Sequence, residues 1–98
     1  MLEDLTHESF APHIGTGFTI HTDERDEVLT LTSVDPAKEY AGQSRQSFAL
    51  VFDGSSNDLM FHSQLVVLDH PEMGDLAITI SPIGRNEDGT YRYEAIFN

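Results

Sequence analysis

Residues 75–97 read Asp-Leu-Ala-Ile-Thr-Ile-Ser-Pro-Ile-Gly-Arg-Asn-Glu-Asp-Gly-Thr-Tyr-Arg-Tyr-Glu-Ala-Ile-Phe, and this stretch decides the fold. Leu76, Ile78 and Ile80 alternate with smaller or polar residues, which is the period-two pattern of a strand with one buried face. Asp88-Gly89 is a strong signal for a tight turn between two strands. The stretch therefore predicts a β-hairpin whose strands cover 75–82 and 90–97.

Similar patterns precede this hairpin from residue 17 onward. Residues 28–34 alternate β-branched residues with leucine, and Phe48, Leu50 and Phe52 form another apolar row. Clusters of Gly, Pro, Asn, Asp and Ser separate the apolar segments and predict turns or loops, of which 35–46 is the longest. We expect strands at 17–22, 28–34, 47–52, 63–69, 75–82 and 90–97.

The segment 5–15 is the only part of the chain with a helical signature. Thr6 can cap its start, Gly15 can end it, and Pro12 limits it to about two turns. Leu5, Phe10 and Ile14 would share one side and cover an open end of the sheet. The sequence thus predicts one mainly β domain over 1–98, a six-stranded antiparallel barrel or roll with one short N-terminal helix.

The composition limits the possible partners. Seventeen Asp and Glu face five Lys and Arg, for a net charge of -12, and this excess repels phosphate backbones, so we expect no direct nucleic-acid binding. No apolar run approaches the length of a membrane helix, and the first residues lack the regions of a signal peptide. We therefore expect a cytoplasmic protein without membrane contact. The absence of cysteine excludes disulfides and thiolate ligands.

Six of the seventeen acidic residues lie in two predicted turns. Three interpretations fit this charge: simple solubility, a basic protein partner, or mimicry of DNA by carboxylates that imitate phosphates. We expect the two turns to be solvated and to share one rim of the sheet. The candidate interaction surface consists of Asp23, Glu24, Asp26, Glu27, Glu87 and Asp88.

Motifs for catalysis or metal binding are missing from the sequence. Five histidines are scattered without the short spacings of metal ligands, and His62 and His70 lie at opposite ends of one predicted strand, roughly 25 Å apart. Residues 86–89 resemble the middle of a calcium loop, but Gly84 and Ala95 stand where its first and last ligands would be. No nucleophile elbow or dinucleotide motif is present. We expect no enzyme activity, no catalytic residue, no cofactor and no metal.

The carboxyl-terminal third contains His-Pro-Glu-Met-Gly at 70–74, Pro-Ile-Gly-Arg at 82–85 and Tyr-Glu-Ala-Ile-Phe-Asn at 93–98. With these motifs the chain resembles an uncharacterised family of short bacterial all-β proteins. Members of that family end in a His-Pro-x-x-Gly turn, a Pro-x-Gly-Arg segment and a Tyr-Glu-Ala-x-Phe-Asn terminus. The resemblance implies a small accessory protein found alongside phage-tail-collar-like surface proteins. One departure is Ser63-Gln64, where relatives have Gln-Gly. The matching segments here are 70–74, 82–85 and 93–98, with further likeness at Leu2, Leu5-Thr6, Phe10, Ile14-Gly15 and 48–52.

These observations favour a non-enzymatic accessory or assembly protein that acts through protein–protein contacts, as a monomer or a small homo-oligomer. The protein partner is not identified by the sequence. The alternative is an acidic DNA-mimic inhibitor of a nucleic-acid-binding protein. A small-ligand carrier ranks third, because side chains should fill the interior of so small a barrel.

Overall fold

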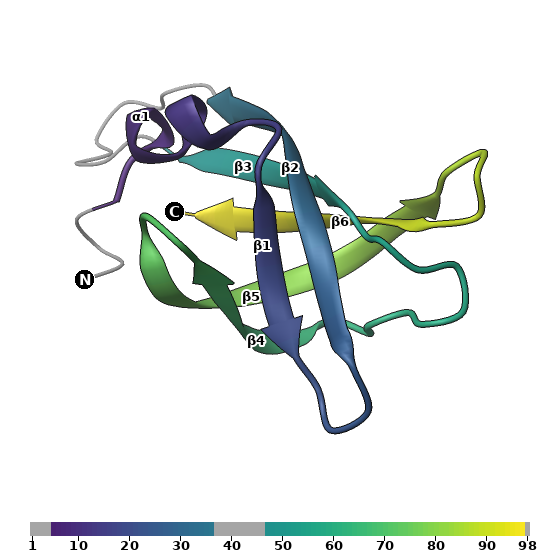
Figure 1. Cartoon of the computed structure of the whole chain (residues 1–98). Coiled ribbons are helices and arrows are strands. Elements are labelled where there is room, and N and C mark those ends of the chain that lie inside the picture. Colours follow the sequence, from purple (N-terminus) through teal and green to yellow (C-terminus); the bar gives the residue numbers. More distant parts are fainter. Residues whose placement is uncertain (1–4, 37–46, 98) are drawn as a thin grey trace.

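The hairpin predicted from residues 75–97 is present in a computed structural model, which describes residues 5–36 and 47–97. The sheet is a closed antiparallel barrel in the order β1-β2-β3-β6-β5-β4 (Figure 1). The predicted six-stranded β fold with a short N-terminal helix is therefore confirmed. The elements are α1 (His7–Phe10), a 3-10 helix η2 (Ala11–His13), β1 (Gly17–His21), β2 (Asp26–Pro36), β3 (Phe48–Asp53), β4 (Gln64–His70), β5 (Gly74–Arg85) and β6 (Tyr91–Phe97).

Strands β2 and β5 extend beyond their predicted limits, and each contains a bulge. The register of β5 against β6 shifts between Pro82 and Gly84. Proline has no N–H to donate to a ladder, so this bulge lets β5 contain Pro82 and continue to Arg85. The register of β2 against β3 shifts between Leu31 and Ser33, and β2 continues to Pro36, which is matched with Phe48. The rest of the predicted loop 35–46 lies outside the described residues.

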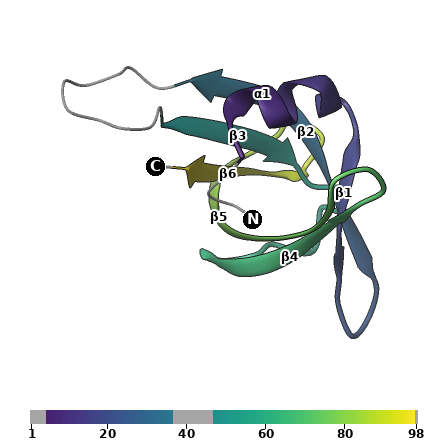
Figure 2. The ribbon, with the colours of Figure 1, turned by 90° about the vertical axis from the view of Figure 1, so that its left-hand side faces the viewer.

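The amino-terminal helical segment consists of α1 and the 3-10 turn η2, about the two turns that were predicted. Pro12 lies in the 3-10 turn η2 rather than in a continuous α-helix, and Gly15 has a φ of 91°, a left-handed conformation that ends the segment. Phe10 is fully buried, with ring centroids 6.0 Å from Phe48 and 5.6 Å from Phe97, and it covers one end of the barrel (Figures 1 and 2). The expectation that Ile14 joins this plug is wrong, because Ile14 is exposed.

The core follows the predicted alternation. Inward-facing residues of every strand meet in one cluster, and the outward-facing residues between them are more exposed. Among the described helices, none is long and apolar enough to cross a membrane. The buried apolar side chains are Phe10, Phe18, Ile20, Leu29, Leu31, Phe48, Leu50, Phe52, Val66, Leu68, Leu76, Ile78, Ile80, Tyr93 and Ala95.

A comparison of two neighbouring residues in β5 tests this register. Ile78→Ala should lower the free energy of unfolding by about 2–5 kcal/mol, because Ile78 is buried and its truncation leaves a cavity. Thr79→Ala, on the exposed face, should change it by less than about 0.5 kcal/mol. Urea denaturation of both variants measures the difference, and equal losses would mean that the two faces are exchanged.

Candidate functional site

Both acidic turns lie at the same end of the barrel. Successive strands are antiparallel, so the β1–β2 turn, the β3–β4 connection and the β5–β6 turn all lie at the end opposite α1 (Figure 1). Strands β3 and β4 are not neighbours, so the connection 54–63 has to cross this end. It contacts one turn through an ion pair of 2.7 Å between Arg25 and Asp58. Asn86 joins the other turn to the end of β3, with its Nδ2 donating to Asp53 at 3.0 Å.

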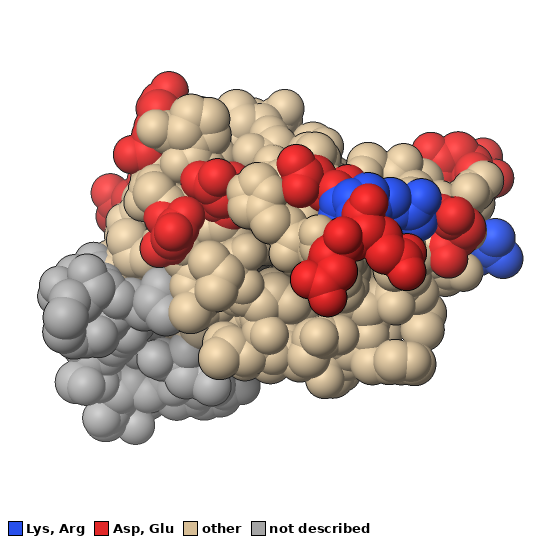
Figure 3. All heavy atoms as spheres, turned by 60° about the horizontal axis from the view of Figure 1, so that its bottom comes forward, with Lys and Arg blue, Asp and Glu red and all other residues tan. Residues whose placement is uncertain are grey.

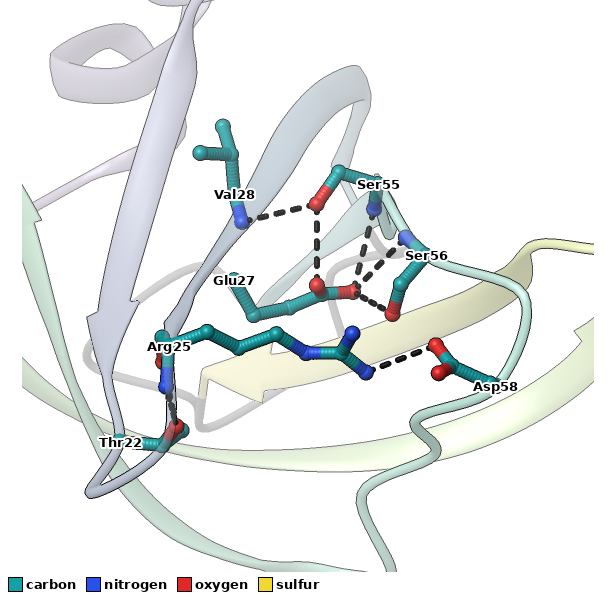
Figure 4. A network of polar contacts seen from close by, with 7 residues as sticks. All are labelled: Thr22, Arg25, Glu27, Val28, Ser55, Ser56 and Asp58. Atoms are coloured by element: carbon teal, nitrogen blue, oxygen red, sulfur yellow. Dashed lines mark hydrogen bonds and ion pairs between the residues drawn. The ribbon is translucent and has the colours of Figure 1, made fainter.

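Glu27 is not part of an exposed acidic surface. It lies in β2 and is only 1% exposed, so its expected place in a solvated turn is wrong. Its carboxylate accepts hydrogen bonds from the backbone N–H and hydroxyl of both Ser55 and Ser56, at 3.0–3.2 Å (Figure 4). Buried charge is tolerated where donors satisfy it in this way. Glu27 therefore fastens the crossing connection to β2.

The alternation of buried and exposed residues in β2 could have predicted that Glu27 is buried. Glu27 lies two residues before Leu29 and four before Leu31, on the same inward face. The run of charges at 23–27 obscured that period. The donors in Ser55 and Ser56 are 28 and 29 residues away in sequence and show no local pattern.

The other acidic residues of the candidate surface are exposed. Asp23 and Glu24 lie in the β1–β2 turn, and Glu87 and Asp88 in the β5–β6 turn. Asp88 accepts hydrogen bonds from the backbone N–H and hydroxyl of Thr90, and these bonds lower its pKa. Figure 3 shows acidic and basic side chains side by side over part of this face, next to a broad area without charged side chains.

A polar hollow of about 400 Å³ lies between the end of β3 and the β5–β6 turn. Its main charges are already paired: Arg92 donates to Asp53 at 2.9 and 3.2 Å, and this contact lowers the pKa of the carboxyl. Within the described part of the chain, no three His, Asp or Glu side chains are grouped so that they could hold a metal ion.

His21, the last residue of β1, lies between carboxylates on the two strands next to it, Asp26 of β2 and Asp69 of β4. Its Nδ1 lies 2.8 Å from Asp26 and its Nε2 lies 3.2 Å from Asp69. Both carboxylates are acceptors, so the imidazole satisfies both contacts as a donor only when it is protonated. The hydrogen bond with Asp26, followed by that with Asp69, raises the pKa of His21. Asp26 is thus exposed but tied to its own hairpin.

A groove opens beside His21 where β1 and β4 separate. These strands are matched at one residue pair, Thr19 with Asp69, whereas the other neighbouring strands have longer registers. The groove has a volume of about 380 Å³. Its lining combines apolar side chains with two carboxylates: Ile20, His21, Thr22, Phe61, Gln64, Val66, Val67, Asp69 and Asp75.

The outward face of β4, β5 and β6 carries exposed apolar side chains. Leu65 is 65% exposed, Val67 54% and Ile96 63%. Leu65 pairs with Thr79 across β4 and β5, and the register of Ser81 with Glu94 puts Ile96 on the same outward face. Sequence analysis had treated these positions only as the outward half of an alternating pattern.

His70, at the end of β4, is also buried. It is 3% exposed, and its Nδ1 accepts hydrogen bonds from the backbone N–H groups of Glu72 and Met73 at 3.1 and 3.2 Å. The proton is then on Nε2, which donates to the Thr16 hydroxyl at 3.0 Å. Burial, and next the charge of His13, lower the pKa of His70. Its position two residues after Leu68 on the inward face was the signal that was overlooked.

The comparisons with known proteins identify a family without a described activity. A family model described as "Domain of unknown function (DUF6916)" matches residues 5–97. The chain belongs to this family. No curated protein and no solved structure matches the chain. The family of unknown function thus agrees with the resemblance found in the sequence, and its function has to be argued from the surfaces described above.

Removal of the Glu27 charge tests its role in the crossing connection. Glu27→Gln should lower the free energy of unfolding by about 2–3 kcal/mol, because an amide presents N–H groups to serine donors that need an acceptor. Glu24→Gln, an exposed control, should change it by less than about 0.5 kcal/mol. Urea denaturation at pH 7 measures both, and a Glu27→Gln variant as stable as the control would contradict the assignment.

The lowered pKa of His70 makes a prediction for acid stability. The unfolded chain takes up a proton near the ordinary pKa of about 6.5, while folded His70 resists it, so its contribution is complete above that pH. The contribution is lost as the pH falls from about 6.5 through the lower folded pKa. The unfolding free energy of the wild type should therefore fall more steeply than that of His70→Gln between pH 7 and 5. Parallel curves would show that His70 does not resist protonation, and His62→Gln serves as an exposed control.

Proposed function

We propose that this domain is a non-enzymatic accessory or assembly protein that acts in the cytoplasm through protein–protein contacts. The observation that carries the proposal is the uncharged apolar row on the outward face of β4 and β6, formed by Leu65, Val67 and Ile96. Single exposed apolar residues are common on soluble proteins. Several on one sheet face, next to a charged border, are typical of an interaction surface.

The chemistry of this face specifies the partner in general terms. An apolar surface on the partner would cover Leu65 and Ile96, and basic side chains around it would match the acidic border of this domain. The resemblance of 70–98 to proteins found alongside phage-tail-collar-like proteins supports an assembly role and makes such a surface protein a candidate partner. A second copy of the chain is the other possible occupant, in keeping with a small homo-oligomer.

Inhibition by DNA mimicry is the second candidate, and the exposed carboxylates of the two turns favour it. A mimic needs such charges spread along a face that displaces nucleic acid in a salt-dependent way. Here Arg25 is paired with Asp58 and Arg92 with Asp53, so positive groups interrupt the acidic surface. Glu27, being buried, offers no charge to a partner. The apolar face therefore supports the assembly role better.

Two matched variants separate these functions. The wild-type domain is used to capture its partner from the native host, and the affinity of the purified partner is then measured. Leu65→Gln/Ile96→Gln should weaken binding at least tenfold, because it removes apolar contact area without disturbing the core. Asp23→Asn/Glu24→Asn should only slow association modestly, since it alters charge at the border.

The reverse pattern would favour the mimic: loss of binding in the charge variant, an unchanged Leu65→Gln/Ile96→Gln variant, and competition by duplex DNA. Sedimentation of the wild type alone tests whether a second copy of the chain covers this face. Any self-association should then be abolished in Leu65→Gln/Ile96→Gln. The assembly proposal is wrong if the wild-type domain retains no specific protein and does not self-associate.

A further inference from the structure

The groove between β1 and β4 combines an incomplete strand ladder with an apolar floor. An antiparallel ladder continued from the Thr19–Asp69 pair would bring Ile20 opposite Leu68 and His21 opposite Val67. The structure has no such pairs in the described register, and the groove opens at these residues. Residues 64–68 of β4 are paired with β5 on one side, so their other edge is left along the groove. An open strand edge is a template for another extended chain.

The floor of the groove suits apolar side chains. Ile20 and Val66 are 6% and 8% exposed and belong to the core, while Phe61 packs against the core from the crossing connection. Val67 is 54% exposed at the border. A volume of about 380 Å³ is within the range of sites that hold small ligands or a few side chains.

The charge at the end of the groove is unusual. Asp69 and Asp75 face each other across β4 and β5, and like charges directly opposite in an antiparallel pair are unfavourable. Both line the groove, and His21 is the one basic side chain in its lining, bonded to Asp69. A second cation placed between these carboxylates would relieve their repulsion. The groove therefore matches a positively charged group in a way that a general acidic surface does not.

From these observations we infer that the β1–β4 groove binds an extended segment of a partner protein, which adds to the open edge of β4 and places a Lys or Arg side chain at Asp69 and Asp75. Main-chain hydrogen bonds to β4 would supply affinity, while the apolar floor and the two carboxylates would select alternate side chains of the segment. The inference rests on the proposed function, because it assumes that the partner is a protein. It assigns a surface distinct from Ile96 on β6, and β4 contributes to both surfaces.

A library of displayed random heptapeptides, panned on the whole wild-type domain, supplies the probe. Selected peptides should contain Lys or Arg among alternating apolar residues. Asp69→Asn/Asp75→Asn should weaken the best synthetic peptide at least tenfold. The matched control Glu87→Gln/Asp88→Gln removes the same charge from the β5–β6 turn and should change its affinity less than twofold. Methylation of the alternate peptide nitrogens that face β4 should abolish binding, because it removes the main-chain hydrogen bonds. Amide hydrogen exchange at residues 64–68 of the domain should slow in the complex.

Three results would overturn the inference. Panning enriches no peptide; or the enriched peptides bind Asp69→Asn/Asp75→Asn and Glu87→Gln/Asp88→Gln equally; or the peptide still binds whichever alternate set of its backbone nitrogens is methylated. Circular dichroism and thermal unfolding establish that both variants are folded. Ile96→Gln, on β6 and away from the groove, should bind the peptide normally, which separates the two surfaces. If Leu65→Gln/Ile96→Gln loses the captured partner while the library yields nothing, the proposed function stands and the groove does not. If the peptide binds but the domain captures no partner, the groove inference stands and the proposed function does not.

Discussion

The hydrogen bonds to the buried Glu27 carboxylate hold the connection that crosses one end of the barrel. Because β3 pairs with β6 and not with β4, the connection 54–63 has to cross an end of the barrel without a strand ladder of its own. Its backbone N–H groups need acceptors. Glu27 provides them at Ser55 and Ser56, and the Tyr93 hydroxyl accepts from the N–H of Phe61 at 3.0 Å. The same two side chains lie at the core, so the crossing segment and the packing inside the barrel are stabilised together.

Closure is less complete on the other side of the barrel. β1 is fully paired with β2, and β4 with β5, but β1 and β4 meet at a single residue pair. His21, at the end of β1, contacts Asp69 of β4 and also Asp26 of β2. This contact is solvent-exposed and depends on protonation, so it holds the strands more weakly than a ladder would. The barrel thus has a crossing connection held by several hydrogen bonds at one end and a seam between β1 and β4, where we propose that a partner segment adds.

The strand pattern could be predicted because it depends on local alternation. Residues 76–80 show one face to the core and the other to solvent, and the structure keeps that register. Glu27 and His70 lie on inward positions of the same kind, but their polarity argued for the surface. Their burial depends on donors and acceptors that come from distant segments or from a turn's backbone, such as Ser55 and the N–H of Met73. The groove could not be predicted either. Alternation shows which residues face the core, but it does not show which neighbouring strands are paired over only part of their length.

The acidic residues of this chain have several different structural roles. Glu27 stabilises a connection, Asp53 and Asp58 pair with arginines, and Asp69 shares His21 with the hairpin. Of these carboxylates only Glu27 is removed from the surface, while Asp53 and Asp58 each have an arginine beside them. The remaining surface is uneven: exposed acids in the turns, a crowded pair at Asp69 and Asp75, and exposed apolar side chains on the sheet face of β4 and β6. Under the proposed function, the position of these charges would govern the choice of partner, because an apolar contact forms only where the charged groups around it are matched.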